Sequence, residues 1–157
     1  MSTAVPAQRD LASPPVPPPE LAGRLGYLLK HAQLGLAELT AAALEPFGLT
    51  GRELAVLTVL ASGEPASQQQ AAQRLGVDRT TMVALVDVLE DKGLVQRRAH
   101  AEDRRRNVVE LTEKGRARLH EAGKAAQEAE SRFLAPLSRN DAQRLKAALL
   151  AVIQPES

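Results

Sequence analysis

Arginine side chains are concentrated in one short stretch of the chain, residues 95–106, which reads VQRRAHAEDRRR. The stretch holds five arginines and two acidic residues, whereas the whole chain has a formal net charge of only +1. Guanidinium groups donate hydrogen bonds in a fixed plane, which suits phosphate oxygens and the edge of guanine. Because the like charges repel one another, the stretch predicts a polyanionic partner. The arginines are Arg97, Arg98, Arg104, Arg105 and Arg106.

A second polar group lies at the start of a helix predicted over residues 78–92. Asp78 is the expected N-cap, and the apolar spacing then leaves Arg79, Thr80 and Thr81 on other faces of the helix. The partial positive charge and free amides of a helix N-terminus favour phosphate, and an arginine there can bind guanine. The predicted buried stripe consists of Met82, Leu85, Val86 and Leu89.

The simpler alternative is that the arginines of residues 95–106 and the polar residues at the start of the 78–92 helix are only solvent-exposed surface. An arginine run can be a charged face without a partner. Likewise Arg79 could pair only with Asp78 or solvent, and the two threonines could serve only as caps. The helix also carries four acidic residues against two basic ones, most of them toward its C-terminal end. Only its first two turns are therefore expected to approach a polyanion.

Local signals place these residues within a regular order of elements. Apolar residues at three- and four-residue spacing predict a long helix over 20–45, and Gly48 predicts a turn after it. A capping box at 50–53 opens a second helix, and a similar pattern at 67–70 opens a third that ends at Gly76.

The second half of the chain continues with a hairpin and two helices. Strands are expected over 95–100 and 107–111, joined by a polar loop, and the hairpin is expected to be exposed. A helix capped by Thr112 should run to about Leu134, and another should open at Ser138. The fold class predicted is mainly α with a small β-hairpin wing: a winged helix-turn-helix flanked by further helices.

Composition limits the remaining possibilities. At 157 residues, the chain predicts a single domain over 20–153, preceded by a disordered tail over 1–19 that holds six of the ten prolines. An arm that embraces a partner subunit is the alternative for that tail. The absence of cysteine excludes disulfides and thiolate metal sites. No apolar run reaches about 18 residues, so we expect a cytoplasmic protein without membrane association.

The stretch from Leu75 to Gly115 resembles the MarR family of winged-helix regulators. Four segments carry the resemblance: Gly76-Val77 in the turn, LEDKGLV at 89–95 where the recognition helix ends, the wing signature DRR at 103–105, and LTEKG at 111–115. The order of helices extends it over about residues 20–153, with dimerisation helices over about 20–45 and 113–153 and the DNA-binding region over about 50–112.

The resemblance implies a homodimer that binds a pseudo-palindromic operator in double-stranded DNA. It implies a repressor whose repression ends when a small-molecule ligand binds. It also implies that Asp103 and Arg105 form the wing pair and that Thr80 contacts a groove of the DNA. Asp103 is expected to orient Arg105. Two departures are visible: the lack of cysteine excludes a peroxide-sensing branch, and the uncharged Ala101 argues against an anionic ligand at that point.

Other kinds of site find little support. The three histidines have no metal-ligand spacing, and no nucleophile elbow, phosphate loop or paired carboxylates point to an enzyme or a cofactor. Tyr27 and His31 lie one turn apart on the first predicted helix and are candidate ligand contacts, although packing or exposure is the simpler role. The function predicted is therefore a sequence-specific DNA-binding transcriptional regulator. The alternative is a winged-helix module that binds a protein partner and binds DNA weakly or not at all.

Overall fold

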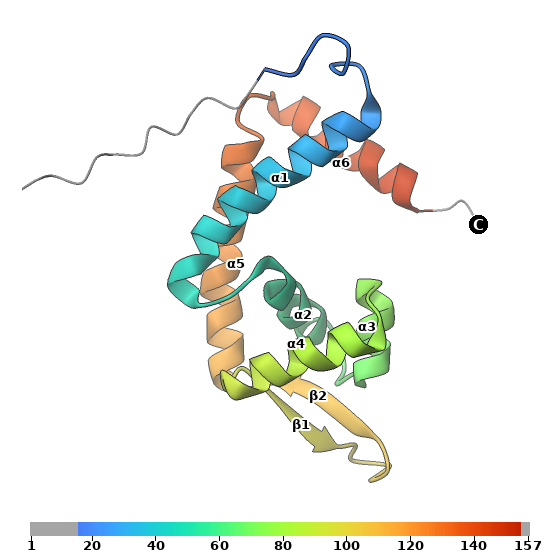
Figure 1. Ribbon diagram of the computed structural model, residues 1–157. Coiled ribbons are helices and arrows are strands. Elements are labelled where there is room, and N and C mark those ends of the chain that lie inside the picture. Colours follow the sequence, from blue (N-terminus) through green and yellow to red (C-terminus); the bar gives the residue numbers. More distant parts are fainter. Residues whose placement is uncertain (1–15, 155–157) are drawn as a thin grey trace, which may run out of the picture. The chain divides into compact units, whose positions relative to one another are not determined.

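The computed structural model describes residues 16–154, and its secondary structure confirms the predicted fold class. That part of the chain contains six α-helices, one 3₁₀ turn and one hairpin, and Figure 1 shows how the helices and the hairpin are arranged. The prediction of a disordered tail falls largely on residues 1–15, outside the described residues. No helix among the described residues is long and apolar enough to span a bilayer. The elements are α1 (Leu25–Leu44), η1 (Glu45–Phe47), α2 (Gly51–Ala61), α3 (Gln68–Leu75), α4 (Arg79–Asp91), β1 (Val95–Ala99), β2 (Asn107–Leu111), α5 (Glu113–Phe133) and α6 (Arg139–Ile153).

Both predicted capping boxes are formed. Thr50 accepts from the amide of Glu53 at 3.2 Å, and Glu53 accepts in return from the amide of Thr50. Ser67 and Gln70 repeat the arrangement at the start of α3. The turn between α3 and α4 depends on Gly76, whose φ of +67° is strained for any residue with a side chain. These caps fix where α2 and α3 begin, and the glycine fixes the direction of α4.

The first helix begins later than predicted. The sequence placed its start at residue 20, but α1 begins at Leu25. The preceding residues form a turn, in which the amides of Leu21 and Ala22 both donate to the carbonyl oxygen of Pro18. The turn includes Gly23, a residue of low helix propensity, and α1 begins after it.

The hydrophobic core lies in the region from the last residue of α1 to the first half of α5. Leu44, Val56, Leu57, Met82 and Leu89 are the largest of its fully buried side chains from the helices. The apolar stripe predicted for α4 is buried at Met82, Val86 and Leu89, and Leu85 packs at its edge. Burial on this side turns the polar N-terminal residues of α4 outward.

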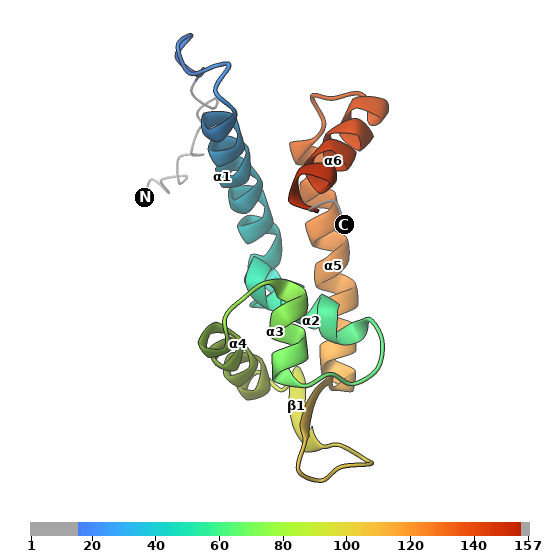
Figure 2. The same cartoon turned by 90° about the vertical axis from the view of Figure 1, so that its right-hand side faces the viewer.

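The hairpin is less exposed than predicted. The strands pair antiparallel with Arg97 opposite Val109, and β2 contributes Val108, Val109 and Leu111 to the buried set. The polarity of β1 and the loop suggested full exposure, but β2 buries three of its five residues, and Val109 also pairs with Ala66. Only the far end of the hairpin, including the loop over 100–106, stands free of α4 (Figures 1 and 2).

The chain divides into two compact units, residues 1–34 and 35–157. The second unit contains the winged helix-turn-helix together with α5 and α6. Within it, the hairpin and α6 lie at opposite ends of α5 (Figure 2). Helix α6 contains no buried residue, and its apolar face is open at Leu145, Leu149, Leu150, Val152 and Ile153.

Candidate nucleic-acid interface

The N-terminus of α4 is closed by Asp78. Its carboxylate accepts from the backbone amide of Thr81 at 2.8 Å and from the hydroxyl of Thr81 at 2.7 Å. These hydrogen bonds, that from the amide first, lower the pKa of Asp78 below its ordinary value of 3.8. Thr81 therefore serves the cap, which agrees with the simpler of its two predicted roles.

Arg79 and Thr80 follow the cap and are exposed. Asp78 is engaged by Thr81, and the guanidinium of Arg79 makes no ion pair with any residue in the range 16–154. The structure thus shows no Arg79–Asp78 pair, and of the two simpler roles considered for Arg79 it leaves contact with solvent. Both side chains remain available to a ligand at the start of the helix.

Arg97 is held inside the protein's own network. Its guanidinium reaches the carboxylate of Asp87 at 2.5 Å, that of Glu90 at 3.2 Å, and the side-chain oxygen of Gln68 at 2.8 Å. The backbone amide of Arg97 also donates to Glu90, at 3.2 Å. Arg97 was predicted to contact DNA, but every nitrogen of its guanidinium already has a partner.

This network also explains the acidic end of α4. Asp87 and Glu90 lie one turn apart on the helix and meet one arginine of β1. The negative charge that seemed unfavourable for a DNA-reading helix is therefore partly balanced within the fold. The sequence analysis missed this pairing, although the three-residue spacing of the two acids was a usable signal.

Arg98 is paired as well, but within the hairpin. Its guanidinium lies 3.0 Å from one carboxylate oxygen of Glu110 and 3.1 Å from the other. Glu110 lies on β2, so this pair joins the two strands to each other and not to α4.

The three arginines of the wing loop differ from these two. Arg104, Arg105 and Arg106 are exposed, and their guanidiniums form no hydrogen bond or ion pair with the part of the chain that the structure describes. Asp103 accepts from the backbone amide of Arg105 at 3.0 Å, and its carbonyl oxygen accepts from the amide of Arg106. Asp103 thus orders the loop main chain beneath Arg105 and leaves the Arg105 guanidinium outside this contact.

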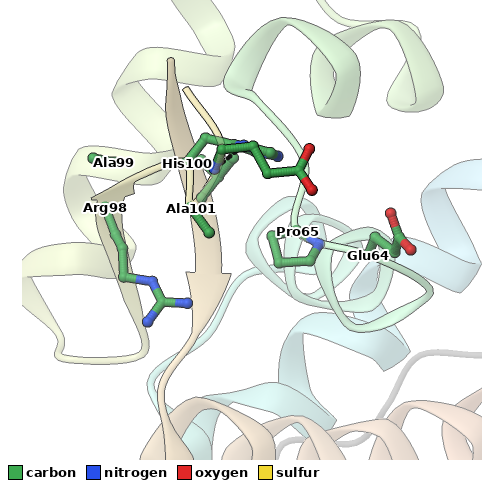
Figure 3. A pocket seen from close by; sticks show the side chains of 8 residues that line it. Glu64, Pro65, Arg98, Ala99, His100 and Ala101 are labelled. Carbon is green, nitrogen blue, oxygen red and sulfur yellow. Dashed lines mark hydrogen bonds between the residues drawn. The ribbon is translucent and has the colours of Figure 1, made fainter. Parts of the chain in front are cut away.

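A hollow of about 460 Å³ lies on the flank of the wing. Figure 3 shows Glu64 and Pro65 from the loop after α2 on one side, and Arg98 to Ala101 on the other. His100 is fixed here because its Nδ1 accepts from the backbone amide of Glu102 at 3.1 Å. The lining combines the carboxylates of Glu64 and Glu102 with the guanidinium of Arg98, and it does not include Arg104 or Arg105.

Tyr27 and His31, the candidate ligand contacts, meet on α1. Their ring centroids are 4.1 Å apart and their planes are tilted by 39°. Tyr27 is half-buried and His31 is exposed. The two tilted rings form a small aromatic surface on the first unit.

Comparison with known proteins identifies the fold. The sequence model described as MarR family matches residues 47–106. A putative transcriptional regulatory protein for the hcr operon of Thauera aromatica is 33% identical over 140 residues, which cover 88% of this chain and 82% of that protein. The chain belongs to the MarR family. Its members are DNA-binding transcriptional regulators and not enzymes.

Solved structures of MarR-family proteins agree over most of the chain. The transcriptional repressor CouR, bound to a 23-mer DNA duplex, is 36% identical with a TM-score of 0.81, covering 87% of this chain and 96% of that one. CouR from Rhodococcus jostii RHA1, bound to p-coumaroyl-CoA, matches with a TM-score of 0.78 at 28% identity, over 87% and 96% of the two chains. The MarR-like likeness therefore extends beyond the winged helix to the flanking helices.

Proposed function

We propose that this MarR-family regulator is a homodimeric repressor that binds a pseudo-palindromic operator and releases it when a small molecule binds. The proposal rests mainly on one observation: some arginines of this region are paired with carboxylates and others are not. Arg97 and Arg98 are occupied by carboxylates, whereas Arg79 and the three loop arginines carry guanidiniums that have no acidic partner among the described residues.

The free cations occur at two positions that suit the two grooves of DNA. Arg79 and Thr80 lie at the exposed start of α4, where winged helices insert into the major groove. The loop arginines lie at the end of a narrow hairpin, and arginine suits the electronegative minor groove. Arg79 would bind a guanine edge or phosphate, Thr80 a thymine methyl or phosphate, and the wing the adjacent minor groove. Thr81 and Asp103 would support these contacts by ordering the main chain.

Support for a dimer comes from uncovered apolar surface. On α6, Val152 is 79% exposed and Ile153 is 72% exposed. On α1, Leu25 is 68% exposed, and Leu28 and Leu29 are also open. Exposed apolar area of this kind marks a surface for association. A second copy of the chain would supply a second winged helix-turn-helix, which would bind the other half-site of the operator.

A small-molecule effector is the third part of the proposal. CouR is solved with p-coumaroyl-CoA, which shows that a relative at 28% identity binds an aromatic thioester. On this chain the Tyr27–His31 pair is the aromatic surface that an effector would contact. The rival function, a module that binds a protein partner, has no comparable observation in its favour.

Selection from a random duplex library tests the proposal. We expect a pseudo-palindrome with half-sites about one helical turn apart, and log affinity that falls by about 0.9 per neutralised phosphate for each log unit of salt. Arg105→Ala should abolish operator binding but leave the dimer and its melting temperature intact. Arg144→Ala, which removes an exposed arginine from α6, is the matched control. No enriched sequence at low salt, or equal binding by both variants, contradicts the assignment.

A further inference from the structure

Arg97 connects three elements that any winged-helix reader must hold in register. It lies on β1, its two carboxylate partners lie on α4, and Gln68 is the first residue of α3. The Arg97 side chain is 27% exposed, so it is shielded more than the acids that it binds. An arginine at the base of the wing thus contacts both helices of the helix-turn-helix.

We propose that Arg97 is a positioning residue that sets the wing at a fixed angle to the recognition helix α4, so that both reach DNA together. This inference rests on the proposed DNA-reading function. The four contacts of Arg97 use all three guanidinium nitrogens and the backbone amide, and two of the four end on Glu90. Such a planar, multiply hydrogen-bonded arginine fixes orientation as well as distance, which a lysine could not do.

The hairpin needs an attachment of this kind. Its core side is held by β2, but β1 carries polar residues over 96–98 and has only Val95 buried. Contacts between Arg97 and α4 therefore replace the apolar packing that β1 lacks. Without them, the loop arginines would still be present but would sample many positions relative to Arg79, and binding both grooves would cost ordering entropy.

The neighbouring arginine supplies a matched comparison. Arg98→Gln removes the same charge from the next residue of β1, but the pair it breaks lies within the hairpin. Arg97→Gln breaks the connection between hairpin and helix. We expect Arg97→Gln to weaken operator binding at least about tenfold, and Arg98→Gln to weaken it far less.

Asp87→Asn should change the affinity for DNA in opposite directions according to whether Asp87 acts only through its charge or acts by holding Arg97. If Asp87 acts only by its charge, removing a negative group from the reading helix should tighten DNA binding. If Asp87 holds Arg97, the same change should weaken binding. The double variant Arg97→Gln/Asp87→Asn should then bind about as well as Arg97→Gln alone, because both remove one interaction.

Two further readouts separate positioning from direct contact. A direct phosphate contact would lower the salt slope by about 0.9, as expected for Arg105→Gln, whereas Arg97→Gln should keep the wild-type slope. Amide hydrogen exchange over 97–106 should become faster in Arg97→Gln and stay near wild type in Arg98→Gln. If Arg97 only stabilised the fold, Arg97→Gln would lower the melting temperature, and amide exchange in the wing would increase by the same factor as in the rest of the domain.

The outcomes distinguish failure of this inference from failure of the proposed function. If the wild-type protein selects no duplex sequence, the proposed DNA-binding function is wrong, and the positioning role of Arg97 is wrong with it. Wild-type protein that binds its operator while Arg97→Gln binds equally well, or binds with a reduced salt slope, overturns the positioning role alone. Tighter or unchanged binding by Asp87→Asn also overturns it.

Discussion

Gly115 lies directly against the main-chain carbonyl of Leu94, with no room for a side chain between them. A Cβ built at Gly115 would overlap the Leu94 oxygen and crowd its carbon. The obstacle is backbone of the segment that joins α4 to β1, so it cannot rotate aside. Gly115 also donates its amide to Thr112, the cap of α5, while the Thr112 hydroxyl donates to Gly93 at 2.6 Å. This contact fixes the start of α5 against the base of the wing.

Gly115→Ala should therefore destabilise the fold, by about 3 kcal/mol if the junction shifts as overpacked sites usually do. The measurement is the free energy of unfolding from urea denaturation. Gly123→Ala on the same helix is the control, because a Cβ there meets nothing within 4 Å. We expect that control to stabilise by up to about 1 kcal/mol, since alanine is the better helix former. Equal effects at the two positions would show that the Leu94 contact is not limiting.

The cap of α4 should make stability depend on pH. Hydrogen bonds from Thr81 lower the pKa of Asp78, so the folded state favours its carboxylate form. The stabilisation is present above the unfolded-state pKa of about 3.9 and is lost as the pH falls through the lowered folded-state value. The melting temperature of Asp78→Ala should thus be lower than wild type by a constant amount above about pH 5, and the gap should shrink below about pH 4.

Asp78→Asn separates charge from capping in that experiment. Asparagine keeps an oxygen that can accept from the amide of Thr81 but has no proton to lose. We expect it to melt between wild type and Asp78→Ala at neutral pH. A gap between wild type and Asp78→Ala that persists unchanged at pH 3 would contradict the role given to the carboxylate.

Local signals made much of this fold readable from sequence. Ser67 and Asp78 cap their helices as predicted, because a cap depends on residues within one turn. The period of the apolar residues of α4 likewise predicted which face is buried. The start of α1 was misplaced because the leucine spacing continues into the turn that Pro18 anchors, where Leu21 lies.

The site was readable only in part, because long-range pairing decides which charges are free. From the sequence alone, the arginines of residues 97–106 were predicted to be equivalent. In the structure Glu90 and Asp87, which are 7 and 10 residues away in the chain, bind Arg97, and Glu110 binds Arg98. Such partners depend on strand register and on how α4 meets β1. The structural role of Gly115 was hidden for the same reason, since the atom it approaches lies 21 residues earlier in the chain.

Glu53 offers a test of a buried charge. Its side chain is only 8% exposed, and Lys92 approaches its carboxylate at 2.7 Å while also donating to the carbonyl of Gly48. Lys92→Met would leave the carboxylate without its cation. Because Lys92 is 37% exposed and water can partly replace it, we expect a loss of about 2 kcal/mol, below that for a fully buried pair.

Lys114→Met is the control for that loss. The Lys114 ammonium donates only to the carbonyl oxygen of Lys92 among the described residues, and its side chain is exposed. Unfolding in urea should show a change of no more than about 0.5 kcal/mol for this variant, as for most surface substitutions. If both lysine variants lose equal stability, the Glu53 pair is not the reason.

The proposed dimer makes a prediction about the apolar face of α6. Leu149 is 40% exposed and lies one turn from Leu145, so a second copy would bury both. Leu149→Glu should shift the protein from dimer to monomer at micromolar concentration, because an unpaired carboxylate would have to be desolvated at the contact. Light scattering after gel filtration gives the mass directly. Gln143→Glu adds the same charge to an exposed polar position of the same helix and should remain dimeric. A Leu149→Glu variant that stays dimeric would exclude this face from the interface, and a wild-type monomer would remove the dimer itself.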